Sequence, residues 1–192
     1  MNMYNILCET PSDINEHLPT LKSIASECES VTEMGVRFVT SSWALVEASP
    51  KKLTCYDINS NFFEEGKGNI EEVCNNKNID FKFIESDTLK LEIENTDFLF
   101  IDTLHTYDQL YRELNLHSKN VNRYIALHDT VSFGYIDEFI YEHASDIIKN
   151  GNCKNVGLVK AINDFLLTVE GKNWTIDRVY ENNNGLTILK RK

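Results

Sequence analysis

Strand-like apolar runs alternate with amphipathic helical segments along most of this chain. Short runs rich in Val, Ile, Phe and Tyr are followed by longer segments in which apolar residues recur every three or four positions. Strands separated by helices of about ten or more residues are typical of βαβ units, which build a parallel sheet with helices on both faces. The sequence therefore predicts an α/β fold of three layers.

The expected elements follow one another in chain order. A first helix over 14–25 begins behind Asp13 and Glu16, which have the spacing of a capping box, and Pro19 marks the start of its main part. Gly66 and Gly68 weaken a later helix. We expect strands at 30–35, 52–58, 80–86, 96–102, 123–129, 174–181 and 186–192, and further helices at 38–49, 61–76, 106–118 and 157–167.

The last two expected strands are joined by Asn-Asn-Asn-Gly at 182–185. Asn-Gly supplies the positive φ angles of a tight turn, so these strands form an antiparallel hairpin. We therefore expect a mostly parallel sheet of seven strands with one antiparallel strand. We expect a single domain over 1–192, with 1–29 as a helical extension and 130–156 as a loop or short helices over the functional site.

Composition and charge narrow the class of partner. The chain has 19 Lys and Arg residues against 30 Asp and Glu residues, and its net charge of −11 argues against binding to a nucleic-acid backbone. A small-molecule ligand is favoured instead. No apolar run approaches the roughly 18 residues of a membrane span, and the first residues lack the basic and apolar regions of a secretory signal. We expect a cytoplasmic protein, and no feature of the sequence indicates an oligomeric state.

The cysteines show no metal-binding pattern. The chain has five of them, an odd number, and no two have the Cys-x-x-Cys spacing. This arrangement argues against a structural zinc site. We expect reduced thiols, and Cys55, inside an expected strand, is a candidate core residue.

Polar residues follow five of the expected strands at the point where each strand ends. In an open parallel sheet, ligands bind outside the carboxyl ends of the strands, near the point where the strand order reverses. Asp57 follows the second strand, where an acid accepts hydrogen bonds from ribose hydroxyls in nucleotide-binding sheets. Gly35 at the first turn lets the backbone approach a ligand closely. The strand-end residues are Glu33, Asp57, Asp87, Asp102, and His128 with Asp129.

Each of these residues also has an explanation that needs no ligand. An acid after a strand can be an ordinary loop residue, and Asp129 can be a turn residue. His105 can cap the helix that begins near Thr106, and His128 can be a buried histidine bonded to the backbone. The other histidines lie in polar helical surroundings, where we expect solvated side chains: His17, His117 and His143.

The chain resembles a known enzyme family in five consecutive segments. They are TEMGVRFVTSSWAL, LTCYDIN, FKFIESD, FLFIDTLHTYDQL and YIALHDT, and they span roughly residues 31–130. Their order resembles the class I S-adenosylmethionine-dependent methyltransferases. More narrowly, it resembles the group of catechol and caffeoyl-CoA O-methyltransferases and cephalosporin-hydroxylase-like sugar O-methyltransferases. The resemblance implies a Rossmann-like sandwich, S-adenosylmethionine as cofactor, and methylation of a small molecule at oxygen.

The resemblance assigns cofactor-binding roles to residues of this chain. The family's first motif is Glu-x-Gly-x-x-x-Gly-x-Ser, and Val39 occupies the place of the second Gly. Ser41 would bond the cofactor carboxylate at a helix start, and Asp57 resembles the acid that binds the ribose. Two residues after the third strand fall where the family contacts adenine. The predicted cofactor-binding set is Glu33, Gly35, Ser41, Asp57, Ser86 and Asp87.

The same resemblance bears on the catalytic centre. Asp102 matches an acid that is a metal ligand in the metal-dependent members, and His128-Asp129 stands where those members have Asp-Asn or Glu-Asp. His105 lies three residues past Asp102, the offset at which the catechol enzyme places a catalytic lysine. We predict His105 and Asp102 as catalytic residues. If a divalent cation such as Mg²⁺ or Mn²⁺ is used, its predicted ligands are Asp102, His128 and Asp129.

Two versions of the chemistry stay open. Methyl transfer to a hydroxyl requires alignment of the two atoms and removal or neutralisation of the acceptor proton. Either a cation held by carboxylates lowers the pKa of the hydroxyl, or His105 is the general base. The sequence slightly favours His105 as a general base over a bound cation, because the strand-end pair is His-Asp.

The alternative function is a non-catalytic nucleotide-binding module of the same fold. An NAD-dependent dehydrogenase fits less well, because the first turn lacks Gly-x-Gly-x-x-Gly.

Overall fold

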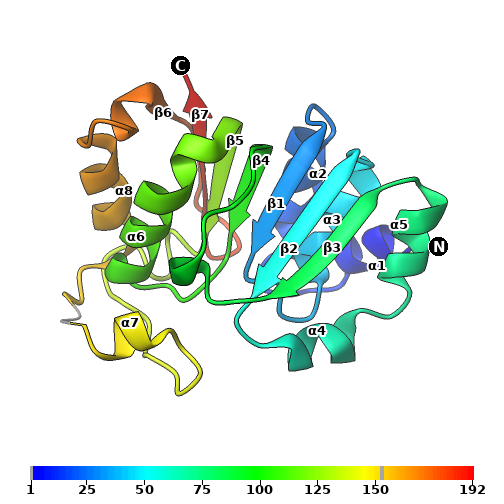
Figure 1. The fold of residues 1–192 in the computed structure, drawn as a ribbon, viewed down its shortest axis with the longest axis horizontal. Helices are drawn as coiled ribbons and strands as arrows, with labels where there is room; N and C mark the ends of the chain where they lie inside the picture. Colours follow the sequence, from blue (N-terminus) through cyan, green and yellow to red (C-terminus); the bar gives the residue numbers. More distant parts are fainter. Residues whose placement is uncertain (1, 152–153) are drawn as a thin grey trace.

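The computed structural model describes residues 2–151 and 154–192 and contains a mixed sheet of seven strands (Figure 1). The strand order is β3-β2-β1-β4-β5-β7-β6. Strands β1 to β5 pair in parallel, and β7 is antiparallel to both β5 and β6. The expected sheet with one antiparallel strand is confirmed. The strands are β1 (Ser30–Met34), β2 (Lys52–Asp57), β3 (Asp80–Glu85), β4 (Thr96–Ile101), β5 (Val121–His128), β6 (Trp174–Tyr180) and β7 (Leu186–Arg191).

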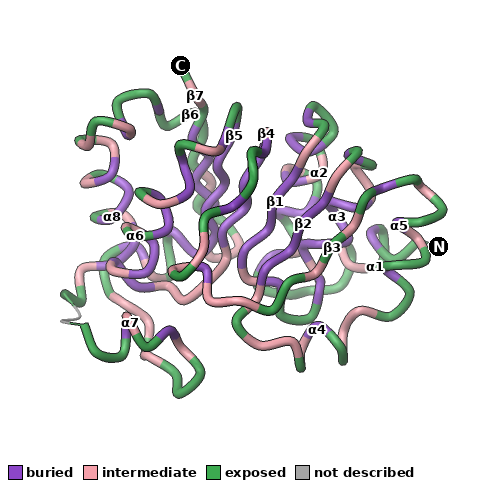
Figure 2. Tube along the Cα trace, viewed as in Figure 1, coloured by how far each residue is buried: buried purple, intermediate pink, exposed green. Residues whose placement is uncertain are grey.

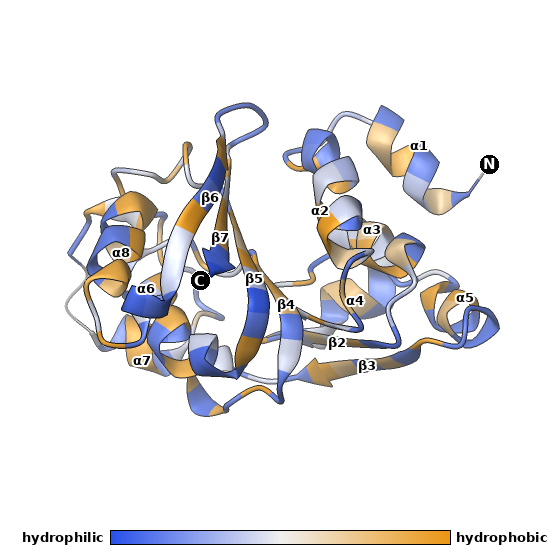
Figure 3. Ribbon diagram, turned by 90° about the horizontal axis from the view of Figure 1, so that it is seen from above, coloured by the Kyte–Doolittle hydropathy of each residue, from blue (hydrophilic) through white to orange (hydrophobic). Residues whose placement is uncertain are grey.

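Helices cover both faces of this sheet, as the expected three layers require (Figure 3). Helices α2 and α3 pack on each other over one face, and α6 and α8 do so over the other. In the described part of the chain, no helix combines the length and the hydropathy of a membrane span. The α-helices are α1 (Met3–Glu9), α2 (Leu18–Ala25), α3 (Thr40–Ala48), α4 (Ser60–Gly66), α5 (Ile70–Asn76), α6 (Tyr107–His117), α7 (Asp146–Lys149) and α8 (Gly157–Leu166), and the short 3₁₀ helices are η1 (Asn15–His17), η2 (Thr88–Lys90), η3 (Ser118–Asn120) and η4 (Gly171–Asn173).

The central strands divide the hydrophobic core into two clusters. Successive side chains of a strand point to opposite faces of a sheet. In β4, Phe98 and Phe100 therefore join the cluster under α2 and α3, whereas Leu99 and Ile101 join the cluster under α6 and α8. Figure 2 shows β1, β4 and β5 largely buried, while the edge strand β3 carries more exposed residues. This rigid centre positions the loops at the strand ends.

Two expected helices differ from the observed ones. The segment 61–76 forms two helices, α4 and α5, and Gly68, with a φ of 50°, lies in the break between them. The helix expected from residue 38 begins at Thr40, because Arg37 and Val39 adopt left-handed backbone angles. The start of α2 at Leu18, with Pro19 in its first turn, agrees with the expected start of the main helix. The capping box expected from Asp13 and Glu16 was wrong, because residues 15–17 form η1 behind Ile14 and no side chain caps it.

The first turn requires glycine for a reason within the fold. Gly35 has a φ of 82°, and a Cβ atom there would lie 2.0 Å from the carbonyl oxygen of Asp102. The backbone at the end of β1 thus passes directly against the backbone at the end of β4. Any side chain at this position would separate the two strand ends that border the site.

The turn at 182–185 connects several segments that are distant in the sequence. Asn183 accepts a hydrogen bond from Glu16 N at 2.9 Å and donates one to Ser12 O at 2.7 Å. The carbonyl oxygen of Asn184 accepts from Val131 N at 2.9 Å. Asn183, Asn184 and Gly185 have positive φ angles, as the Asn-Gly pattern predicts. The hairpin turn therefore holds both the N-terminal region and the start of the segment after β5.

Two histidines that we expected to be solvated are buried. His17 is 1% exposed and His117 is 0% exposed, so this expectation was wrong, whereas His143 is exposed as expected. Each buried ring is bonded to a backbone carbonyl: His17 Nε2 to Asn182 O at 3.0 Å, and His117 Nε2 to Thr88 O at 2.9 Å. A ring nitrogen that donates to a carbonyl lets a neutral imidazole be buried.

Candidate active site

A cavity of about 560 Å³ opens at the carboxyl ends of strands β1 to β5. The segment after β5 contributes Phe133, Glu138, Tyr141 and Ser145 to its wall. The cavity lies where the strand-end residues predicted a ligand site. Of the predicted site residues, Gly35, Ser41, Asp57, Ser86, Asp87, Asp102, His105 and Asp129 line the cavity, while the buried Glu33 and His128 lie beneath its wall.

The loop between β1 and α3 has an unusual backbone. Arg37 has a φ of 46° and Val39 a φ of 59°. A β-branched residue at positive φ is strained, and Val39 occupies the place at which the family motif has a glycine. The Val39 side chain is 1% exposed and belongs to the core, so its burial offsets part of the strain. The loop therefore keeps a left-handed turn at this position without the glycine.

Asp57, at the end of β2, holds the first two loops together. Its Oδ2 atom accepts hydrogen bonds from Val36 N at 2.8 Å and Arg37 N at 2.9 Å, and its Oδ1 atom accepts one from Asn59 N at 3.0 Å. A carboxylate offers about four lone-pair positions, so one position remains for a ligand in the cavity. Asp57 therefore fixes the backbone of the loop between β1 and α3, in addition to any direct contact with a ligand.

Glu33 supports the cavity from beneath. Its side chain is fully buried and accepts hydrogen bonds from Ser41 Oγ, Ser42 Oγ and Cys55 Sγ. Burial raises the pKa of Glu33 to about 7, although these hydrogen bonds act in the opposite direction. In this arrangement Glu33 fixes the first turn of α3, and its contribution to ligand binding would be indirect.

The residues after β3 connect the cavity to the segment after β5. Ser86 N donates to Asp57 O at 2.8 Å. Asp87 Oδ1 accepts from Leu89 N at 3.0 Å and so caps η2, while Asp87 Oδ2 accepts from Ser145 Oγ at 2.7 Å. Asp87 therefore anchors the part of the later segment that contains Ser145 at the cavity edge.

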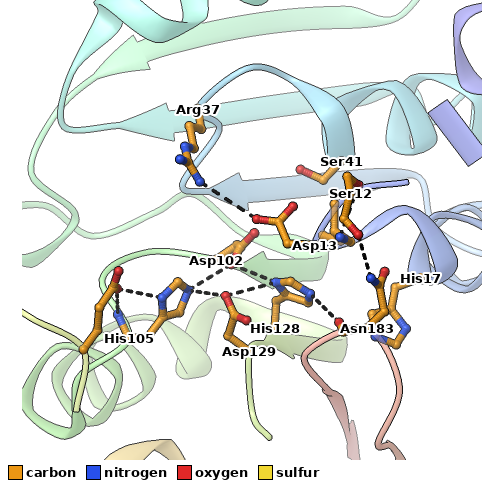
Figure 4. Close-up of polar contacts among 12 residues, drawn as sticks. Ser12, Asp13, His17, Arg37, Ser41, Asp102, His105, His128, Asp129 and Asn183 are labelled. Carbon is orange, nitrogen blue, oxygen red and sulfur yellow. Dashed lines mark hydrogen bonds and ion pairs between the residues drawn. The ribbon is translucent and has the colours of Figure 1, made fainter. Parts of the chain in front are cut away.

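Four predicted catalytic and metal-binding residues meet at the ends of β4 and β5 (Figure 4). His105 Nε2 lies 3.1 Å from Asp102 Oδ1 and 3.0 Å from Asp129 Oδ2. His128 Nδ1 lies 3.2 Å from Asp102 Oδ1 and 3.5 Å from Asp129 Oδ2. Sequence reasoning missed a fifth member, Glu138, whose Oε2 atom lies 2.7 Å from His105 Nδ1. Glu138 lies in an irregular segment, where no local pattern marks it.

The ligand-free explanations for these residues hold only in part. Thr106 caps α6, so the His105 side chain is engaged elsewhere. His128 is buried and bonded to the carbonyl of Asn183, but its other ring nitrogen faces the acids. Asp129 has the positive φ of a turn residue, 58°, yet its carboxylate faces both imidazoles.

The neighbouring carboxylates hold both imidazoles in the charged form. Burial lowers the pKa of His105, but hydrogen bonds to Asp102 and Glu138 outweigh burial and raise the pKa to about 10. Burial likewise opposes the charge of His128, but the neighbouring Asp102 raises its pKa to about 11. Burial alone would raise the pKa of Asp102, yet the two histidines hold it well below its usual range. An imidazolium ion donates protons, which weighs against His105 as the general base.

Asp102, His128 and Asp129 have the donor set of a divalent-cation site. One ligand atom from each lies within 4.8 Å of the others. Asp129 Oδ1 is buried and has no hydrogen-bond partner among residues 2–151 and 154–192. His128 Nε2 donates to Asn183 O at 3.3 Å, so Nδ1 would be the ligating atom, with the cation in place of its proton. The residues present therefore fit a cation, and an imidazole with two carboxylates suits Mn²⁺ better than Mg²⁺.

A second buried acid, Glu113 of α6, holds three side chains of the cavity wall. Thr88 Oγ1 donates to Glu113 Oε1 at 2.6 Å, Gln109 Nε2 donates to the same atom at 2.7 Å, and Thr103 Oγ1 donates to Oε2 at 2.7 Å. Burial raises the pKa of Glu113, and these three donors counteract it. Sequence reasoning missed this network. Its signal was a polar residue on the apolar side of the helix, three positions after Leu110.

Comparison by sequence finds no relative: no protein-family model matches this chain, and no curated protein matches it. Solved structures match it clearly. A protein from Staphylococcus aureus that is provisionally assigned as a caffeoyl-CoA O-methyltransferase aligns with a TM-score of 0.67 and 14% sequence identity, over 100% of this chain and 93% of that chain.

Two further structures were solved with a bound cofactor or its product. An O-methyltransferase from Bacillus cereus in complex with SAH has a TM-score of 0.64 and 16% identity, over 92% of this chain and 81% of that chain. The O-methyltransferase TomG from Streptomyces achromogenes, in complex with SAM, has a TM-score of 0.60 and 14% identity, over 95% and 82%. The chain therefore has the Rossmann-like fold of these O-methyltransferases, as the resemblance in its motifs implied.

Proposed function

We propose that this protein transfers a methyl group from S-adenosylmethionine to an oxygen atom of a small molecule. The observation that carries the proposal is the cavity, which collects the ends of five strands in a fold whose solved members include complexes with SAM and SAH. The same cavity wall carries the acid after β2, the glycine of the first turn and four members of the charged cluster: Asp102, His105, Asp129 and Glu138.

The half of the cavity at the ends of β1, β2 and β3 suits the cofactor, which supplies a methyl group already activated on a sulfonium sulfur. Asp57 would accept a charge-assisted hydrogen bond from a ribose hydroxyl at its remaining acceptor position. Ser41 and the first turn of α3 would hold the cofactor carboxylate, since free N–H groups at a helix start favour an anion. Ser86 and Asp87 would border the adenine, and Glu33 would act through Ser41.

The half at the ends of β4 and β5 suits the acceptor. Here Asp102, His105 and Asp129 would surround the acceptor hydroxyl beside the transferred methyl group. Asp129, which lines the cavity beside them, would accept the hydroxyl proton. A cation held by Asp102, His128 and Asp129 would lower the pKa of that hydroxyl.

The net charge and the free thiols of the chain support an inference about its partner and its compartment. Four cysteines, Cys8, Cys28, Cys55 and Cys74, are free thiols, while Cys153 lies outside the described residues. Free thiols are typical of a reducing compartment, and a net charge of −11 disfavours a nucleic-acid partner. We therefore infer a cytoplasmic enzyme that acts on small molecules.

Titration calorimetry with S-adenosylhomocysteine tests the proposal most directly. Saturable binding with one site per chain is the expected result, and absence of binding would refute it. Transfer of a labelled methyl group to a panel of hydroxylated small molecules then tests the reaction. Activity that EDTA abolishes and Mn²⁺ restores would support the cation version, and activity that survives EDTA but not His105→Ala would support the base.

A further inference from the structure

The side chain of Gln109 presents one unused polar atom at the cavity. The residue is 5% exposed and forms part of the cavity wall. Its two amide hydrogens are both donated, to Glu113 Oε1 at 2.7 Å and to Thr88 Oγ1 at 3.3 Å. The carbonyl oxygen of this amide accepts no hydrogen bond from the described residues. This oxygen is not among the fully buried atoms that lack a partner, so it is accessible and can accept a hydrogen bond from a ligand in the cavity.

Glu113 fixes which way this amide points. A carboxylate only accepts hydrogen bonds, so the amide nitrogen must face Glu113. Thr88 uses its own hydroxyl hydrogen on Glu113 at 2.6 Å and can therefore only accept from Gln109. A flipped amide would place its oxygen against two acceptors. The network thus gives the cavity an acceptor at this point and excludes a donor.

The position of this acceptor matches one end of the expected cofactor. Gln109 lines the cavity together with Ser86 and Thr88 from the end of β3 and Thr103 and Leu104 from the end of β4. The ribose position at Asp57, at the end of β2, adjoins β3 in the sheet. A base attached to that ribose would extend toward the loops after β3 and β4, and so toward Gln109.

We propose that the Gln109 carbonyl oxygen accepts a hydrogen bond from the exocyclic amino group of adenine, and that Glu113 is the positioning residue that sets this preference. The inference rests on the proposed function. It predicts that the site distinguishes adenine from hypoxanthine, which carries a carbonyl oxygen in place of the amino group. Two facing acceptors repel each other, and a site built to receive a hydrogen bond rejects an analogue that cannot donate it.

The test compares two ligands by titration calorimetry: S-adenosylhomocysteine and its deaminated analogue S-inosylhomocysteine. The wild type should bind the first at least about tenfold more tightly, the size of one unmatched hydrogen bond. Gln109→Leu should reduce this ratio to within about twofold of one. Glu113→Gln should also lower it about tenfold, because a carboxamide at 113 can donate to Gln109 and lets its amide turn around.

A matched control separates this role from simple damage to α6. Leu114→Ala removes a fully buried side chain from the same helix without touching the polar network. It should lower thermal stability but leave the ratio of the two dissociation constants unchanged. A fall in the ratio for Leu114→Ala as large as that for Gln109→Leu would overturn the assignment.

The outcomes also separate this inference from the proposed function. If the wild type binds S-adenosylhomocysteine but Gln109→Leu keeps the full ratio of the two dissociation constants, Gln109 does not distinguish adenine from hypoxanthine. Only this inference then fails. If the wild type binds neither ligand, the proposed function fails and the inference fails with it. If Glu113→Gln does not fold, the Gln109→Leu result alone decides.

Discussion

The two halves of the cavity use acidic residues in different ways. At the ends of β1 and β2, the carboxylates of Glu33 and Asp57 are bonded to hydroxyl, thiol and backbone N–H groups. At the ends of β4 and β5, Asp102 and Asp129 face two imidazoles, and one of their oxygens has no partner among the described residues. Acids at equivalent strand ends therefore shape loops in one half and form a charged centre in the other.

The role of a strand-end acid therefore depends on the groups that its carboxylate contacts more than on its position in the sheet. A carboxylate bonded to neutral donors holds the backbone in place, and its loss should weaken binding or stability. A carboxylate between imidazolium ions can exchange protons or hold a cation, and its loss should affect the chemical step. Substitutions in the two halves should thus be separable by measuring binding, stability and turnover independently.

The largest effect is expected from Asp102→Asn in the charged half. This change removes the charge shared by His105 and His128. Methyl transfer should fall by about 10³-fold, within the range for a lost acid–base group. Binding of S-adenosylhomocysteine should change by less than about threefold, because Asp102 belongs to the acceptor half of the cavity and acts on the chemical step. Steady-state rates and calorimetry measure the two quantities. A variant that loses binding and turnover in equal proportion would remove the proposed division between the halves.

The next effect is a pH-dependent change in stability from Glu33→Gln in the loop-shaping half. The pKa of Glu33 is about 7 in the folded protein, above its usual value of about 4.5. Between these values the folded state binds a proton that the unfolded chain does not, so stability falls as pH rises through this window and then levels off. The variant lacks this loss, and its stability relative to wild type should rise by up to about 3 kcal/mol between pH 4.5 and 7.

Urea unfolding at several pH values measures this difference. Glu72→Gln, at an exposed position of α5, is the matched control and should show no such trend. A flat difference curve for Glu33→Gln would mean that the buried Glu33 carboxyl is ionised throughout the range.

A smaller effect is expected from Asp57→Ala. The variant loses the acceptor for three backbone N–H groups and for the ribose, and S-adenosylhomocysteine should bind roughly ten- to hundredfold more weakly, or about 1.5–3 kcal/mol. Asp97→Ala is a close control, because Asp97 Oδ2 likewise accepts from two backbone N–H groups, of Glu29 at 2.9 Å and Ser30 at 3.3 Å, at the opposite end of the sheet. Asp97→Ala should lower stability and leave binding intact; equal losses of binding would contradict a local role for Asp57.

The smallest effect is expected from Val39→Gly. Glycine releases left-handed strain of about 1–2 kcal/mol but forfeits the burial of a valine, worth about 1.5–3 kcal/mol. The net loss of stability, measured by urea unfolding, should be only about 1 kcal/mol. Val36→Gly, a buried residue of the same loop without a positive φ, should cost clearly more. Equal costs would show that Val39 is not strained.

The parts of the site that the sequence predicts are those set by topology. Parallel strands meet at one edge, so Asp57, Asp102 and Asp129 could be placed at the cavity from their positions after apolar runs. Glu138 and Gln109 could not, because their roles depend on how an irregular segment and a helix pack against the strand ends. Burial of His17 depends in the same way on a carbonyl supplied by Asn182, far along the chain. Hydrophobic periodicity in the sequence indicates which face of a helix or strand is buried. It does not indicate which residues of other elements that face will contact.

The turn at 182–185 has a consequence for engineering of this chain. Hairpin tips are usually the first choice for inserting tags, fluorophores or foreign peptides, because they tolerate added length. Here the tip is bonded to the N-terminal region through Asn183 and to the segment after β5 through Asn184, and a Cβ at Gly185 would lie 2.6 Å from Val131 N. Labels are better placed at the loop before η4, where Leu167 and Val169 are 77% and 88% exposed and lie outside the cavity wall.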